Sequence, residues 1–140
     1  MLNKINASIF LLSMVISFLS SCNKDNLNKK FGQYAIGVKY DGDGALNLRF
    51  FIEGKESGTL QVMAIDRPSP INDCKDLKNP QELINVFVVQ NVAVGKHQLE
   101  IKTEAGKLVE TLEFNMLDRE CIFQEISISA DKIKKPASLN

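Results

Sequence analysis

The stretch that decides the fold runs from Tyr34 to Ile52 and reads YAIGVKY-DGDG-ALNLRFFI. Apolar side chains recur at every second position on both sides of the Asp-Gly repeat: Tyr34, Ile36, Val38 and Tyr40, then Leu46, Leu48, Phe50 and Ile52. A period of two indicates β-strands with one face in a core. Because Asp-Gly pairs supply the positive φ that tight hairpins need, we predict a β-hairpin with its turn at 41–44.

The same kind of pattern continues along the chain. Further strands are predicted at 59–65, 83–89, 97–101, 108–114 and 121–129, separated by turns at 53–58, 104–107 and 116–120. The segment 83–89 (LINVFVV) is nearly all apolar, as expected of a central strand buried on both faces. Residues 66–81 contain three prolines and are predicted to form a long irregular connection.

Seven short strands without a convincing helix predict an all-β fold. We expect a single antiparallel β-sandwich over residues 31–129, with residues 130–140 as a disordered polar tail. The run from Val92 to Ile101 (VAVGKHQLEI) resembles a strand of the small transthyretin-like and immunoglobulin-like domains of exported bacterial proteins. This resemblance implies a sandwich and transfers no functional residue. The tryptophan of true immunoglobulin domains is absent.

The first 21 residues are organised like a signal peptide. Lys4 is followed by a mostly apolar segment from Ile5 to Leu19, and small residues then precede Cys22. The motif Leu19-Ser20-Ser21-Cys22 resembles the lipobox of bacterial lipoproteins. The resemblance implies that residues 1–21 are removed and that Cys22 is acylated. The alternative is an ordinary secretory signal cleaved after Ser20 or Ser21, which would leave Cys22 as a free thiol.

A lipobox also implies a location and a first partner. We expect a protein of a Gram-negative cell envelope, held at the outer membrane by the acylated Cys22, with the lipid bilayer as its partner. The face of the membrane stays open. Residues 22–30 are polar apart from the lipidated cysteine and Leu27, and they are predicted to be a flexible tether.

The cysteine count agrees with this assignment. With Cys22 assigned to lipid, Cys74 and Cys121 remain as a pair, and paired cysteines of exported proteins usually form disulfides. Two separate buried thiols are the alternative. The CxxC motif of thiol oxidoreductases is absent from the sequence.

Charge and histidine content exclude several functions. The chain has 17 basic and 17 acidic residues, which is not the basic footprint of a nucleic-acid-binding protein. His97 is the only histidine, so blue-copper sites and histidine-based zinc clusters are excluded. The sequence also lacks the Gly-x-Ser-x-Gly elbow of serine hydrolases. We therefore predict a non-enzymatic protein without a cofactor, in which His97 is a partly buried structural residue.

Two sets of residues remain as candidates for binding. The side-chain oxygens of Asp41, Asp43 and Asn47 could bind Ca²⁺, although an Asp-Gly repeat is also what a hairpin turn requires. Phe51 and Phe123 lie on the strand faces opposite the core residues, where they are either covered by a second layer or the 66–81 connection, or form a partner-binding patch. The sequence thus predicts a binding or accessory module with a protein or glycan partner. The alternative is a carbohydrate- or calcium-binding module that uses the 41–47 turn.

Overall fold

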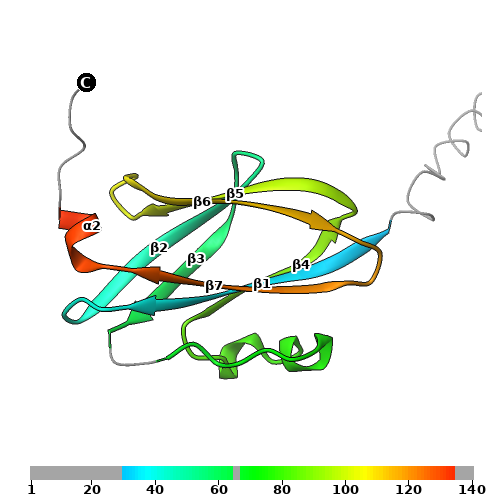
Figure 1. The fold of residues 1–140 in the computed structure, drawn as a ribbon, viewed down its shortest axis with the longest axis horizontal. Helices are drawn as coiled ribbons and strands as arrows, with labels where there is room; N and C mark the ends of the chain where they lie inside the picture. Colours follow the sequence, from blue (N-terminus) through cyan, green and yellow to red (C-terminus); the bar gives the residue numbers. More distant parts are fainter. Residues whose placement is uncertain (1–29, 65–66, 135–140) are drawn as a thin grey trace, which may run out of the picture.

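The computed structural model describes residues 30–64 and 67–134 (Figure 1). The predicted signal peptide, Cys22 and residues 23–29 and 135–140 lie outside this part of the chain. The described part contains seven strands in two sheets: β1 (Phe31–Tyr40), β2 (Ala45–Ile52), β3 (Lys55–Met63), β4 (Val86–Ala93), β5 (Gly95–Thr103), β6 (Leu108–Met116) and β7 (Cys121–Ile128). The prediction of an all-β sandwich is confirmed.

The two sheets differ in size and in strand direction. One has the order β3-β2-β5-β6 and the other the order β4-β1-β7. Neighbouring strands are antiparallel except β1 and β7, which run parallel from Gln33 opposite Cys121 to Tyr40 opposite Ile128. The prediction of a wholly antiparallel sandwich was therefore wrong for this pair. The β6–β7 turn carries the chain from one sheet to the other, so no hairpin fixes the direction of β7 against β1.

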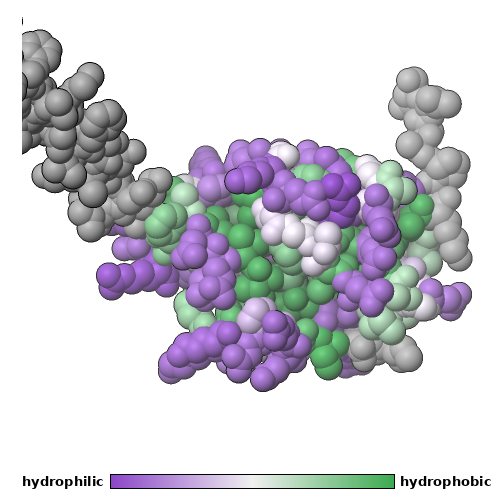
Figure 2. Space-filling model, turned by 180° about the vertical axis from the view of Figure 1, so that it is seen from behind, coloured by the Kyte–Doolittle hydropathy of each residue, from purple (hydrophilic) through white to green (hydrophobic). Residues whose placement is uncertain are grey.

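The main core lies between the sheets, and Figure 2 shows apolar side chains gathered in the middle of one face of the molecule between polar ones. Its fully buried side chains include Tyr34 and Ile36 of β1, Phe50 of β2 and Ile101 of β5. Aromatic rings join the layers, since Tyr34 stacks on Phe114 of β6 with ring centroids 4.1 Å apart. Each large apolar side chain buried in this way contributes roughly 1.5–3 kcal/mol, so these alternating residues account for the pairing of the two sheets.

The connection between β3 and β4 covers the outer face of β1. It contains two short 3-10 helices, η2 (Cys74–Leu77) and η3 (Pro80–Glu82), and Leu77 is fully buried against Ala35. A side chain at Gly37 would meet Pro68 Cβ at 2.8 Å, so the connection lies directly on the strand. As a result β1 is buried on both faces, whereas alternation predicted a half-buried strand. Phe123 packs against the same cluster, which confirms cover by this connection as its environment.

β4 differs from the strand predicted at 83–89. It begins at Val86 and is an edge strand that pairs only with β1. Two residues explain the shift: Ile84 is 49% exposed, and Asn85 has a left-handed backbone with φ 52°. Val86 is buried because the connection covers its face of the sheet, so an apolar run that resembles a central strand belongs to a covered edge.

The chain continues after β7 into a short helix, α2 (Ala130–Lys134). Ala130 N–H donates to Asp41 Oδ1 at 2.8 Å, Lys132 Nζ lies 2.7 Å from a Glu110 carboxylate oxygen, and Lys107 Nζ donates to carbonyls of α2. The prediction of a disordered tail is therefore wrong for residues 130–134. In the described part of the chain, no helix has the length and apolar character needed to cross a membrane.

Candidate functional site

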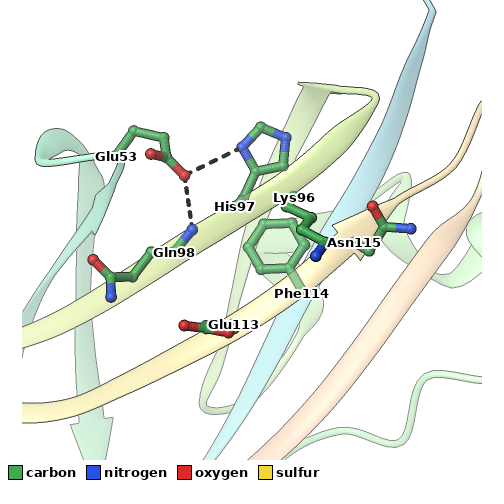
Figure 3. Close-up of a pocket in the computed structure, with 7 residues that line it drawn as sticks. All are labelled: Glu53, Lys96, His97, Gln98, Glu113, Phe114 and Asn115. Carbon is green, nitrogen blue, oxygen red and sulfur yellow. Dashed lines mark hydrogen bonds and ion pairs between the residues drawn. The ribbon is translucent and has the colours of Figure 1, made fainter.

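A shallow hollow of about 430 Å³ opens beside the β2–β3 turn (Figure 3). Strands β5 and β6 form its floor, and the turn forms one wall. All of its lining residues except one phenylalanine have polar side chains; they are Glu53, Lys96, His97, Gln98, Glu113, Phe114 and Asn115. Sequence reasoning singled out only His97 among these residues.

Glu53 is held in the hollow by the geometry of its turn. Glu53 and Gly54 have φ of 52° and 73°, which are the positive values that a two-residue hairpin requires. The turn is thus shorter than the predicted 53–58 segment, and β3 begins at Lys55. Glu53 N–H donates to Gln98 O at 3.1 Å, and Gln98 N–H donates to Glu53 Oε1 at 2.8 Å. The carboxylate therefore extends the β2–β5 ladder beyond its last pair.

His97 lies between this carboxylate and the core. Its Nε2 is 2.8 Å from Ala93 O, and because a carbonyl only accepts, Nε2 carries the proton. Nδ1 lies 3.7 Å from Glu53 Oε1 and has no hydrogen-bond partner within the described residues. The ring packs 5.2 Å from that of Phe114, and the side chain is only 14% exposed. The prediction of a partly buried histidine is confirmed.

The hollow offers donors and acceptors rather than a concentrated charge. Glu53 and Glu113 can accept hydrogen bonds, while Lys96 and Asn115 can donate them. This mixture suits a neutral polar group, such as an amide or a hydroxyl, more than an ion.

The contact between Glu53 and His97 could not be predicted from the sequence, because the two residues are far apart in it. The one local signal is the Glu-Gly pair, which is typical of a two-residue turn.

Two of the three residues proposed for calcium make other contacts. Asp41 Oδ1 accepts from Ala130 N–H, whereas Asn47 bonds to Glu104 at 3.0 Å and to Gln61 at 3.3 Å. Asp43 is exposed. Within residues 30–64 and 67–134, no group of three or more His, Cys, Asp or Glu side chains is placed to hold a metal ion. The structure thus gives the 41–47 turn a role in fastening α2 and provides no argument for a calcium site.

Phe51 lies on the outer face of the larger sheet under two cations. Arg49 Cζ is 5.2 Å and Lys102 Nζ is 4.7 Å from its ring centroid. Arg49 also forms an ion pair with Glu56, and the hydrogen bond from Arg49 lowers the pKa of the Glu56 carboxyl. Phe51 is therefore covered by charged side chains, not by the β3–β4 connection, and this face is polar.

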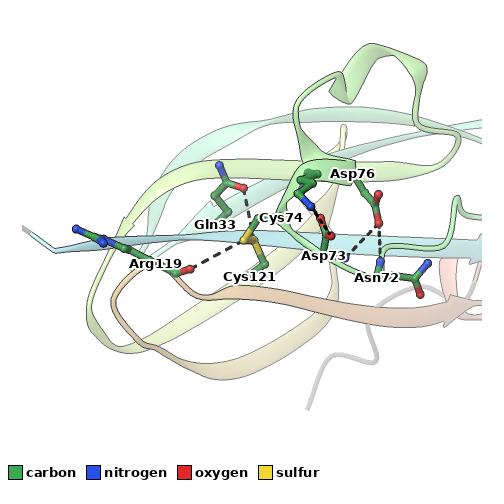
Figure 4. Close-up of a disulfide and its surroundings, with 8 residues drawn as sticks. Gln33, Asn72, Asp73, Cys74, Asp76, Arg119 and Cys121 are labelled. Carbon is green, nitrogen blue, oxygen red and sulfur yellow. Dashed lines mark hydrogen bonds and ion pairs between the residues drawn. A yellow bond between two sulfur atoms is a disulfide. The ribbon is translucent and has the colours of Figure 1, made fainter.

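The predicted disulfide is present between Cys74 and Cys121, with Cα atoms 5.4 Å apart (Figure 4). It fastens η2 to the first residue of β7. Next to it, the Asp76 carboxylate accepts from the N–H groups of Asn72 at 2.7 Å and Asp73 at 3.2 Å, and these bonds lower its pKa. The bridge fixes the connection on the smaller sheet, and the cap orders the start of η2 within the connection.

Known proteins give no further guidance to the site. Comparison of the sequence with models of protein families and with curated proteins finds no match. The assignment of a function therefore depends on the residues and geometry described above.

Proposed function

We propose that the protein is a lipid-anchored lipoprotein of a Gram-negative cell envelope, acylated at Cys22 and held at the outer membrane. The observation that carries the proposal is the motif Leu19-Ser20-Ser21-Cys22 directly after an apolar segment. Acylation of the thiol and of the new amino group would supply three chains, and two membrane signals are enough for stable attachment.

The use of the other cysteines supports this proposal. The chain has three cysteines, and the disulfide engages Cys74 and Cys121. Cys22 is therefore the one cysteine left for another chemistry. A disulfide is also typical of proteins that fold in an oxidising compartment, which agrees with export.

For the sandwich we propose a non-enzymatic binding or accessory role. The single histidine and the described cysteines take part in structural contacts: His97 Nε2 contacts Ala93 O, and Cys74 and Cys121 form the disulfide. The hollow beside Glu53 offers exposed donors and acceptors without a buried charge. These features suit a protein or glycan partner bound at the surface.

Labelling with a palmitate analogue in a Gram-negative host tests the anchor. The wild-type chain should incorporate the label and sediment with membranes, whereas Cys22→Ser should do neither. Ser21→Ala is the matched control because it keeps a small residue before the cysteine, and it should behave like wild type. Label in Cys22→Ser, or none in the wild-type chain, would refute the proposal.

A further inference from the structure

One end of the sandwich contains both the entry of the chain and two exposed turns. Lys30 O accepts from Val94 N–H at 3.2 Å, and Phe31 O accepts from Arg119 N–H at 2.8 Å. Figure 1 shows the chain entering β1 at the same end as the β4–β5 and β6–β7 turns, while α2 lies at the opposite end. We call the group of Lys30, Val94, Leu117 and Arg119 the entry tip.

The entry tip presents aliphatic side chains to solvent. Val94 is 43% exposed and Leu117 is 54% exposed. The β5–β6 ladder ends with Gly95 opposite Met116. Val94 and Leu117 are the next residues beyond this pair and therefore lie side by side. Turn positions usually have polar residues that interact with water, so two adjacent aliphatic side chains here suggest another environment.

Three basic and two acidic residues lie in or beside these turns, so positive charges outnumber negative ones by one. Lys30, Lys96 and Arg119 are exposed and form no ion pair within the described residues. Asp118 is an exposed acid, and Glu120 accepts from Leu117 N–H at 2.9 Å. Aliphatic side chains bordered by basic ones match a bilayer surface, where the former enter the headgroup boundary and the latter meet phosphates.

We propose that the entry tip contacts the bilayer that holds the acylated Cys22. The sandwich is then oriented end-on to the membrane, with Val94 and Leu117 in the headgroup boundary. This inference rests on the proposed anchor. The eight steps from Cys22 to Lys30 span at most about 28 Å. A weak contact is sufficient, because the anchor makes it intramolecular and raises the effective concentration of the surface.

The same strand provides a matched pair of probes. Leu117 follows the end of β6, and Leu108, 52% exposed, begins it. The two positions are separated by roughly 30 Å of extended chain. Because the protein has no tryptophan, Leu117→Trp and Leu108→Trp each give a single fluorescent reporter of similar exposure at opposite ends.

The experiment uses the lipidated chain in phosphatidylethanolamine–phosphatidylglycerol vesicles with and without brominated acyl chains, which quench nearby tryptophan. Leu117→Trp should lose about twofold more fluorescence to bromine than Leu108→Trp, with a blue-shifted emission. Val94→Trp should behave like Leu117→Trp.

Three results would overturn the inference, and they are distinguishable. If the acylated chain floats with the vesicles but neither tryptophan is quenched, the anchor stands and the tip is free for a protein partner. Equal quenching of both probes would mean that the domain lies on its side. A chain without acyl groups on Cys22 would refute the anchor and, with it, this orientation.

Discussion

The side-chain amide of Asn85 pairs with both backbone polar groups of Met63: Oδ1 accepts from Met63 N–H, and Nδ2 donates to Met63 O, each at 2.9 Å. The backbone O of Asn85 also accepts from Val38 N–H at 2.9 Å. Met63 belongs to the larger sheet and Val38 to the smaller. One buried asparagine therefore joins β3, an edge strand of the larger sheet, to β1 of the smaller sheet, where the two sheets share no ladder.

This arrangement predicts a graded response at position 85. Asn85→Gly keeps the left-handed backbone but loses both amide bonds, which should cost about 1–3 kcal/mol of unfolding free energy. Asn85→Ala should cost about 1–2 kcal/mol more, because a Cβ disfavours positive φ. Urea denaturation measures both. Asn91 is the control, since it is exposed with φ 59°, and Asn91→Gly should change little. Equal effects at the two positions would contradict the role of the amide.

The disulfide should contribute strongly to stability. It joins residues 47 positions apart, and the chain-entropy account gives roughly 4 kcal/mol for a loop of that length. The double substitution Cys74→Ala and Cys121→Ala should lower the unfolding free energy by about this amount and speed hydrogen exchange at residues 67–84. A reductant should weaken wild type and leave the double variant unchanged. An equal free energy of unfolding for the double variant and wild type would contradict this contribution of the disulfide.

Low pH should destabilise the β3–β4 connection by protonating Asp76. Hydrogen bonds from Asn72 and Asp73 lower the pKa of its carboxyl below the unfolded value. The stabilisation is thus complete above the unfolded pKa, near pH 4, and is lost as the pH falls through the folded pKa. We expect Asp76→Asn to be less stable than wild type at pH 7 and the gap to narrow at pH 3. A gap that stayed constant between these pH values would contradict the assignment.

High pH should destabilise the folded protein by favouring ionisation of Tyr34, which is buried in the core. Burial raises the pKa of its hydroxyl, which also donates to Gln124 Oε1 at 2.5 Å. An unfolded tyrosine ionises near pH 10, so this contribution is complete below that pH and is lost as the pH rises above it. Tyr34→Phe keeps the stacking on Phe114 but has no proton to lose. Unfolding measured from pH 8 to 11 should show wild type falling toward the variant, and parallel curves would contradict this.

Features that depend on a local pattern, such as strands and turns, could be predicted from the sequence. Features that depend on the packing of segments against one another could not. Alternation at Tyr34–Tyr40 and Leu46–Ile52 was enough for the hairpin, and the parity of cysteines was enough for the Cys74–Cys121 pair. The parallel pairing of β1 and β7 has no local signal because it follows from how the two sheets close. The run at 83–89 was misread because Val86 is covered by the irregular connection that precedes it, and an apolar run does not show whether a strand or a loop provides the cover.

The candidate site shows the same division. A partly buried His97 followed from its place among core positions. Its meeting with Glu53 depends on the register of β2 against β5, two strands that are far apart in sequence, and the sequence pattern does not reveal that register. Cys22 is the reverse case, since its assignment comes from a short linear motif.

The mass of the N-terminal peptide of the mature protein tests the central claim most directly. The account predicts a peptide that begins at Cys22 and is heavier than its sequence by a diacylglyceryl group and an amide-linked fatty acid. A peptide that begins at Ser21 or Cys22 with the mass of its unmodified sequence would contradict the lipid anchor and favour an ordinary secretory signal.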